Sequence, residues 1–497
     1  MRVYEAIAWA ALLFLSFPPV GAAQSAKASN KATETQTPSP PTYGARARVR
    51  RAAPRDANAQ RSRTIVTKEQ MDERVARSAP EALRYVPGVS LQQTSHGQAS
   101  PYVRGLTGQQ VVHIFDGVRM NNGLYRQGPN QYFFTVDSLT IDHLEVIRGS
   151  SSTLYGSDAI GGAILASPRM IPLEAGEPGK LKLHPRVFGR FGSADRELGG
   201  RMEMGANLGS RTSILVGGGY RDVSRLRSGG VVTNPGFPMP MVPRFEADGK
   251  TQLGTGFEEA TFDTRLLHRL SPELQVVGAV YGYLQSDAPR TDQCPPSEAP
   301  ADECLSIASE RRVLSYASLR GNAGKQIRDL ELTLSYQHYG EHRVRDRPRS
   351  GVAFDWRDRV GTYGLSLRAA TRDFRWGEAR HWKLRYGADA YRDGVESKAE
   401  QAFTDIRRSF ALSRGQYLSD SSYLLVGAYS ELEVQPLPWM TWRGGGRVSG
   451  VGIRAPGDPE SGSRAVSKNL SAVVGRVGVE IRPAEPIAIL ANFDQGF

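Results

Sequence analysis

Residues 141–164 read IDHLEVIRGSSSTLYGSDAIGGAI and join a half-apolar strand to a serine-rich turn and a second strand. The chain has to turn sharply at Gly149, because glycine tolerates backbone angles that are closed to other residues. Ser150 is predicted to cap a short helix by accepting a hydrogen bond from a backbone N–H of its first turn. Gly161 and Gly162 open the next strand. The stretch therefore predicts one compact strand–turn–helix–strand unit.

Three further motifs precede this unit. They read EALRYVPGV at residues 81–89, YVRG at 102–105 and VHIFDGV at 112–118. A single Arg-Gly or Asp-Gly pair carries no information, but four motifs in this order do. Together they resemble the plug domain of TonB-dependent outer-membrane receptors, clearly over residues 64–168 and more weakly, as a barrel, over the rest.

The resemblance implies a mainly β protein with a small α/β plug domain (residues 64–170) inside an antiparallel transmembrane β-barrel. Barrels of this family have about 22 strands. The plug motif residues are expected to be structural, since glycines and an inward Arg or Glu hold a plug together. They are Arg104, Gly105, Asp116, Gly117, Glu145, Arg148, Gly149, Tyr155, Gly156, Gly161 and Gly162.

The N-terminus is typical of an exported protein. Arg2 precedes an apolar core at residues 7–17, and small residues at 21–23 predict signal-peptide cleavage after residue 23. Residues 24–63 contain almost no large apolar side chains and predict a flexible periplasmic arm. The arm is rich in arginine, which suggests nucleic acid or an anionic membrane surface as partner, but a signal peptide argues against nucleic acid.

In the family, such an arm carries the TonB box, an extended segment that pairs with the energy-transducing protein by strand addition. The positional candidate is YGARARV, with Tyr43, Ala45, Ala47 and Val49 alternating with other residues. It departs from the family's apolar-Thr-apolar-Val pattern, so a plain linker is the alternative.

Composition alone resembles that of a soluble protein. The 497 residues are 39% hydrophobic, the mean hydropathy is −0.40, and no internal apolar run has the length of a membrane helix. A membrane β-barrel hides its apolar face by alternation, however, and residues 330–336 and 382–390 alternate with a period of two. A large soluble β-sandwich is the alternative.

About thirteen strands are predicted in residues 180–497, many of them long enough to cross a membrane at a tilt. Besides the two alternating segments, they lie near Arg186, Gly200, Ile214, Phe262, Val277, Leu314, Leu365, Val426, Arg443, Val477 and Ile489. The connections at 193–196 and 271–272 read as tight periplasmic turns. Long outward loops are expected at 224–259, 286–311, 341–359 and 393–422.

The two cysteines, Cys294 and Cys304, lie in one predicted long loop. An exported chain reaches an oxidising compartment, so a local disulfide is expected. A cysteine metal site is the alternative, for which Asp292, Asp302 and Glu303 are the nearby ligand types.

The chain ends in IAILANFDQGF, which resembles a mid-barrel strand of these receptors. A terminal Phe can also end a finished outer-membrane barrel. A barrel of about thirteen strands is too narrow for a plug of this size, and bacterial barrels have even strand numbers. A chain that lacks its C-terminal third is therefore expected.

The resemblance implies a receptor in the outer membrane of a Gram-negative bacterium, surrounded by outer-membrane lipid. Such receptors import a ferric siderophore, haem or cobalamin with energy delivered through TonB. No cofactor of its own is expected, although the substrate itself may be a metal chelate.

The expected ligand face is the plug apex, formed by residues 92–101 and 119–134. Candidate contacts are Tyr125, Arg126, Gln127, Asn130 and Tyr132, which offer stacking and polar anchors. His96 could be an axial ligand of haem, since neutral imidazole binds iron. The alternatives are a polar loop packed against the barrel wall and a solvated histidine.

No catalytic motif was found: the chain has no Gly-x-Ser-x-Gly, no His-Glu-x-x-His and no phosphate-binding loop. Two other classes remain as alternatives, a passive porin or adhesin-like barrel and, last, a secreted β-rich enzyme. A porin should lack the domain at 64–168, and an enzyme should show a convergent site.

Overall fold

The computed structural model describes residues 61–125, 132–173, 180–232, 245–291, 303–377, 380–484 and 487–497. Residues 56–497 form one compact unit. The predicted signal peptide, the TonB-box candidate and nearly all of the predicted arm lie outside the described residues. No helix in the described ranges is long and apolar enough to span a membrane.

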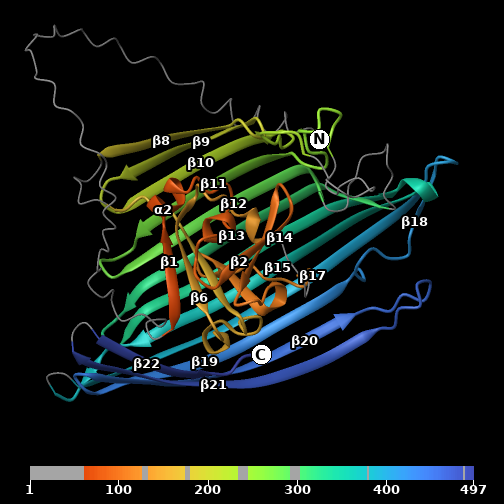
Figure 1. Ribbon diagram of the computed structural model, residues 1–497. Helices are drawn as coiled ribbons and strands as arrows, with labels where there is room; N and C mark the ends of the chain where they lie inside the picture. Colours follow the sequence, from red (N-terminus) through yellow and green to blue (C-terminus); the bar gives the residue numbers. More distant parts are fainter. Residues whose placement is uncertain are drawn as a thin grey trace, which may run out of the picture. The chain divides into compact units, whose positions relative to one another are not determined.

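Most of the described chain forms one antiparallel sheet, whose strands follow one another in sequence order (Figure 1). They are β8 (Leu181–Gly192), β9 (Glu197–Leu208), β10 (Thr212–Val223), β11 (Phe257–Arg269), β12 (Leu274–Pro289), β13 (Cys304–Ala323), β14 (Ile327–Arg347), β15 (Val352–Thr371), β17 (His381–Phe403), β19 (Ser421–Leu437), β20 (Met440–Ala455), β21 (Val466–Ala484) and β22 (Ile487–Asp494). The short strands β16 (Phe374–Arg375) and β18 (Arg408–Ala411) pair with β17 and bring this sheet to 15 strands. Each strand predicted after residue 180 corresponds to one strand of this path, so the barrel prediction is confirmed.

Along the strands of the large sheet, exposed apolar side chains alternate with buried polar ones, as in a membrane β-barrel. In β14, Leu332, Leu334 and Tyr336 are exposed, whereas Thr333 and Gln337 between and beside them are buried. Period-two alternation places successive side chains on opposite faces. The sheet therefore presents an apolar face outward and a polar face to the interior.

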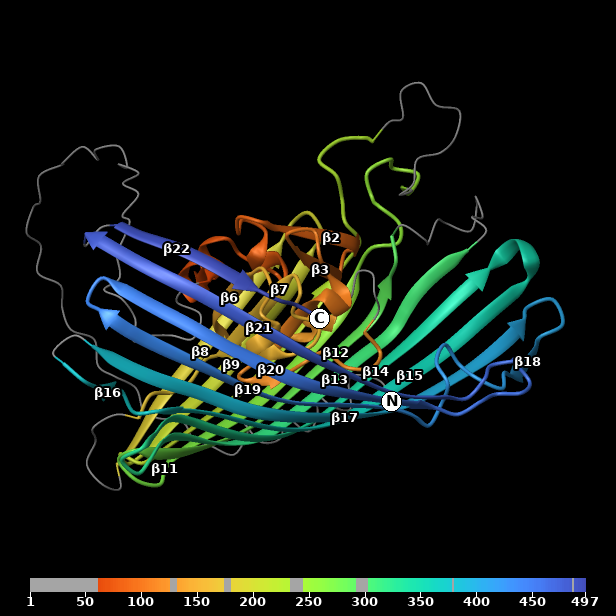
Figure 2. The ribbon, with the colours of Figure 1, turned by 90° about the horizontal axis from the view of Figure 1, so that it is seen from below.

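The plug contains a five-stranded mixed sheet with the order β1-β6-β7-β4-β5. Its strands are β1 (Ser62–Thr67), β4 (Val111–Phe115), β5 (Val118–Arg119), β6 (Ile141–Arg148) and β7 (Gly162–Pro168), and a separate hairpin joins β2 (Val89–Ser95) to β3 (Gln98–Val103). Helical segments are α2 (Lys68–Glu73), α3 (Ser152–Tyr155), η1 (Glu81–Leu83), η2 (Gly108–Gln110) and η3 (Tyr132–Thr135), while η4 (Pro348–Ser350) lies between β14 and β15. Figure 2 shows plug elements such as β2, β3, β6 and β7 over one face of the large sheet.

The stretch quoted first folds as β6, α3 and β7. Gly149 and Gly162 have φ of +91° and +147°, which explains why glycine is needed at both positions. The predicted cap is wrong: the N-cap of α3 is Ser151, which makes no side-chain capping bond. Ser150 Oγ instead donates to the carbonyl oxygen of Gln495, at 2.7 Å, because its side chain is directed to the end of β22.

Three loop predictions need correction. Residues 341–359 are not a loop but the ends of β14 and β15, joined by a tight turn, and β17 continues to Phe403 inside the predicted 393–422 loop. Because successive strands are antiparallel, the connection 193–196 lies at the same end of the sheet as the long connections 224–256 and 404–420. We call this the long-connection end. The turn at 193–196 therefore lies at the opposite end of the sheet from the tight turn at 271–272, with which it was predicted to share the periplasmic side.

Candidate functional site

The plug contacts one face of the large sheet through polar side chains on many strands. Asp137 of the plug accepts hydrogen bonds from Arg201 Nη1 at 3.2 Å and from Thr261 Oγ1 at 2.9 Å. Gln337 Nε2 donates to the carbonyl oxygen of Arg119 at 2.6 Å. We call the plug-facing side the inner face of the sheet and the opposite side the outer face. The inner face and the plug together form the candidate site.

Asp116 makes the densest of these contacts. It lies in the two-residue turn between β4 and β5, where Asp116 and Gly117 both have positive φ, as a type I′ hairpin turn requires. Its carboxylate lies 2.7 Å from Arg265 Nη2 and 3.2 Å from Arg320 Nη1, and it accepts a hydrogen bond from Tyr316. Burial raises the pKa of Asp116, but the two guanidiniums outweigh it and hold that pKa below its usual value.

A second group of motif residues ties the first strand of the plug to its centre. Arg148 Nη1 donates to Thr64 Oγ1 at 2.7 Å and to the carbonyl oxygen of Pro87 at 3.2 Å. Glu145 lies 3.4 Å from Arg63 in an ion pair. These contacts hold β1, the strand that directly follows the arm, and they are structural contacts within the plug.

The remaining motif residues lie at turns or against the large sheet. Arg104 and Gly105 form a positive-φ turn closed by hydrogen bonds between Val103 and Leu106. The ring of Tyr155 lies 5.8 Å from the guanidinium carbon of Arg368. A Cβ at Gly156 would lie 3.0 Å from Arg447 Nη2, and one at Gly161 would lie 2.7 Å from the side chain of Leu106. Glycine at both positions thus permits the plug backbone to pass close to the side chains of Arg447 and Leu106.

His96 lies at the tip of the β2–β3 hairpin. Its Nε2 is 3.2 Å from Asp195 Oδ2 and 3.3 Å from Arg77 Nη1, and its ring meets Phe257 edge-on. Burial lowers the pKa of His96. Asp195 belongs to the 193–196 turn, so the hairpin tip lies at the long-connection end, as expected for an apex. The Nε2 atom, however, is engaged within the protein.

Tyr125 is buried rather than open to a ligand. It is 3% exposed and packs in a cluster with Leu124, Tyr339, Val360 and Val395. Burial raises the pKa of its hydroxyl to about 12. The other apex candidates, Arg126, Gln127 and Asn130, and the side chain of Tyr132 lie outside the described residues.

The region predicted as a loop at 341–359 carries a cluster that the sequence interpretation missed. Arg343, Arg345 and Arg347 alternate along β14 on the same face as Gln337, and Phe354 and Trp356 oppose them on β15. The aromatic rings stack at 5.4 Å, and the guanidinium carbon of Arg345 lies 4.5 Å from the Trp356 centroid. We call these five residues the arginine–aromatic ladder.

The ladder lies on the inner face at the long-connection end. Glu303 pairs with Arg345 at 3.5 Å and Arg347 at 3.2 Å, and Arg343 pairs with Asp358 at 3.2 Å. The alternating arginines in RVRDR opposite FDW were the available sequence signal. Arginine alternation without apolar partners does not resemble a membrane strand, so the sequence alone predicts a charged loop here.

Cys304, the first residue of β13, is disulfide-bonded. Cys294, Asp292 and Asp302 lie outside the described residues, so the pairing of Cys294 with Cys304 stays a prediction. Glu303 is engaged by the ladder arginines. Within the described ranges, no group of three or more His, Cys, Asp or Glu side chains could hold a metal ion.

Comparisons with known proteins agree with this geometry. The profile of the TonB-dependent Receptor Plug Domain matches residues 55–163. The vitamin B12 transporter BtuB of Photobacterium profundum is 39% identical over 102 residues, which cover 20% of this chain and 16% of the relative. A hemin receptor of Yersinia pestis is 24% identical over 353 residues, which cover 70% of this chain and 47% of the receptor.

Solved structures share the fold at low sequence identity. The copper transporter OprC superposes with a TM-score of 0.67 at 15% identity, over 87% of this chain and 63% of OprC. The hemophore receptor HasR of Serratia marcescens superposes with a TM-score of 0.64 at 16% identity, over 88% of this chain and 64% of HasR. The chain thus spans less than two thirds of the length of these relatives. The plug domain of this chain is thus that of the TonB-dependent receptors, and its antiparallel sheet has the fold of their outer-membrane barrels.

Proposed function

We propose that this protein imports a scarce nutrient across the outer membrane, with energy delivered through TonB. The single observation that carries the proposal is the plug domain held by ion pairs and hydrogen bonds to the polar inner face of the sheet. The names of the relatives, a vitamin B12 transporter and a hemin receptor, support a substrate among ferric siderophore, haem and cobalamin. In this proposal residues 64–170 form the plug, 180–497 contribute barrel strands, and the arm at 24–63 contacts TonB.

The contact between plug and sheet is apolar in part, since Leu267, Val277 and Leu314 of the sheet pack against the apolar core of the plug. Its polar part suits a domain that has to move. Asp116, Asp137 and the carbonyl oxygen of Arg119 all meet side chains of the sheet through polar contacts. Polar groups that separate can be solvated by water. Separation of an apolar interface instead costs a free energy of about 25 cal/mol for each Å² of apolar surface that becomes exposed. A ligand can shift the plug only if it contacts the resting and displaced states differently.

The arginine–aromatic ladder is the proposed first contact for the ligand. Guanidiniums bind anionic groups with paired hydrogen bonds, and the stacked rings of Phe354 and Trp356 offer a surface for a planar group. The ladder shares the long-connection end with the hairpin tip at His96. Together with the apex candidates Arg126, Gln127, Asn130 and Tyr132, it favours an anionic ligand with a planar part.

The test of the function is uptake by cells that express the complete protein. Labelled ferric siderophore, haem and cobalamin are supplied separately, with and without collapse of the proton-motive force. We expect one of them to accumulate only in energised cells, because transport against a gradient requires work. Accumulation that persists after the collapse would instead indicate a passive porin.

Replacement of the ladder tryptophan should weaken ligand binding. Trp356→Ala removes the ring that Arg345 and Phe354 contact, and we expect affinity for the transported ligand to fall about tenfold, as loss of a desolvated stacking contact implies. Binding to cells at low temperature, without transport, is the measurement. Trp442→Ala is the matched control, because Trp442 is an exposed tryptophan of β20 on the outer face. Equal affinity of the two variants would contradict the assignment of the ladder.

A further inference from the structure

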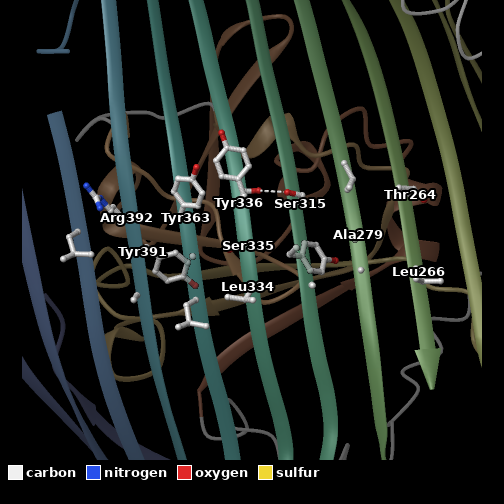
Figure 3. Close-up of a pocket in the computed structure, with 18 residues that line it drawn as sticks. Thr264, Leu266, Ala279, Ser315, Leu334, Ser335, Tyr336, Tyr363, Tyr391 and Arg392 are labelled. Atoms are coloured by element: carbon white, nitrogen blue, oxygen red, sulfur yellow. Dashed lines mark hydrogen bonds between the residues drawn. The ribbon is translucent and has the colours of Figure 1, made fainter. Parts of the chain in front are cut away.

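The outer face of the large sheet has an apolar hollow of about 870 Å³ between β11 and β19 (Figure 3). Its walls include Leu266, Leu334 and Leu365, which are 40%, 60% and 46% exposed. Its floor includes the small residues Gly278, Ala317 and Ala390. The hollow forms because Gly278 and Ala317 lie side by side between the larger Leu266 and Leu334 on neighbouring strands. Its volume suits a hydrocarbon chain.

An aromatic pair and an arginine border this hollow on the side of the long-connection end. Tyr336 and Tyr363 are paired across β14 and β15, with ring centroids 4.9 Å apart, and Tyr363 pairs in turn with Arg392 of β17. Figure 3 shows the two tyrosine rings and Arg392 in one row across the strands. Tyrosine is enriched where a protein surface passes from hydrocarbon to the polar head-group region. The row therefore marks the polar border of the apolar band.

A pair of arginines lies above this border. Arg311, Gly340 and Arg359 are paired across β13, β14 and β15, four residues along β14 from Tyr336, a rise of about 13 Å. Both arginine side chains converge over the glycine: a Cβ at position 340 would lie 3.2 Å from Arg311 Nε and 3.7 Å from Arg359 Cγ. We call Arg311 and Arg359 the outer arginine pair.

The side chains of the outer arginine pair are exposed. Neither guanidinium lies within 4.0 Å of a carboxylate among the described residues, although Glu396 occupies the next position of the row beside Arg359. This contrasts with inner-face arginines such as Arg265, Arg320 and Arg443, which form ion pairs with Asp116 or Glu433. Two unmatched guanidiniums on a surface that borders hydrocarbon indicate an anionic partner at the membrane interface.

We propose that this surface binds a phosphorylated membrane lipid. Its head-group phosphate is held between Arg311 and Arg359 over Gly340, and one of its acyl chains fills the hollow. Guanidiniums bind phosphate oxygens with paired hydrogen bonds, and each nearby Arg or Lys strengthens binding to anionic lipid. Arg392, at the border, contacts the linkage between head group and chain. The site lies on the outer face and is independent of the transported nutrient.

The test uses the complete protein reconstituted in phosphatidylcholine vesicles with spin-labelled lipid. Electron paramagnetic resonance gives the association constant of spin-labelled phosphatidic acid relative to spin-labelled phosphatidylcholine. We expect the wild type to prefer phosphatidic acid, and Arg311→Gln with Arg359→Gln to reduce that preference by about fivefold for each arginine lost. The matched control, Lys325→Gln with Arg375→Gln, removes two exposed cations at the opposite end of the same sheet and should leave the preference unchanged.

A second variant keeps both charges. Gly340→Leu places a side chain between the arginines, and we expect it to remove the preference as well, because the phosphate then has no room. Three results would overturn the proposal: no preference in the wild type, equal loss in the control and the arginine double variant, or an equal preference for spin-labelled stearic acid. Displacement of phosphatidic acid by millimolar inorganic phosphate would show a site for free phosphate and would also overturn it.

Discussion

Deletion of residues 43–49 from the complete protein is expected to abolish energised uptake and to leave ligand binding intact. The window contains the TonB-box candidate Tyr43, Ala45, Ala47 and Val49, whereas the proposed ligand contacts lie on β14 and β15. Strand addition to the box would transmit the pull to β1, which Arg148 and Glu145 hold within the plug. Uptake and low-temperature binding of the transported nutrient are measured on the same cells.

The control for this deletion removes a different part of the same arm, residues 28–34, and should leave uptake unchanged. If deletion of 43–49 has no effect, the whole arm at 24–63 is deleted next, because the box can lie elsewhere in it. Energised uptake that survives the larger deletion would exclude the arm as the coupling element. A porin would transport in every one of these variants.

Replacement of Gly162 by alanine is expected to unfold the plug. Gly162 begins β7 with φ of +147°, and a Cβ there would lie 2.1 Å from the carbonyl oxygen of Ile147 in the paired strand β6. Neither the Cβ nor the carbonyl oxygen can move away, since both are attached directly to the backbone of paired strands in the plug sheet. We expect the free energy of unfolding to fall by on the order of 4 kcal/mol. Protease sensitivity of the plug and loss of uptake are the measurements.

Gly105→Ala is the control that separates the cost of backbone strain from the cost of the steric clash in Gly162→Ala. Gly105 also has a positive φ, of +83°, but a Cβ there would meet no heavy atom within 4 Å. Its replacement should cost only about 1 to 2 kcal/mol, the strain of a left-handed residue. Equal protease resistance of the two alanine variants would show that the contact with Ile147 does not constrain the plug.

The strands were predictable because the two faces of a membrane sheet, one apolar and one polar, produce an alternation between neighbouring residues in the sequence. Leu330 to Tyr336 alternates with a period of two, and this segment lies in β14 with Leu332, Leu334 and Tyr336 exposed. Gly149 likewise predicted a sharp turn, and it has a φ of +91° between β6 and α3. Such features depend on neighbours in the chain, so they can be read without a structure.

The ends of the long strands were not predictable in this way. Residues 341–359 are charged and poor in apolar alternation, yet β14 and β15 remain paired up to Arg347 and Val352. Beyond the hydrocarbon, a strand needs only a partner with which to hydrogen-bond, not an apolar face. The arginine–aromatic ladder lies in this extension, which is why a candidate site was missed there.

The sequence by itself determined the family, the order of the strands and the two-residue alternation along them. Tertiary structure alone decided which side chains face the plug and what they meet there. Ser150 bonds to Gln495 and Asp116 to Arg265, and both contacts join residues that are far apart in the chain. Alternation divides a strand into two faces with no reference to other strands, whereas these partners are selected by sheet register and by the position of the plug, which depend on the whole chain at once.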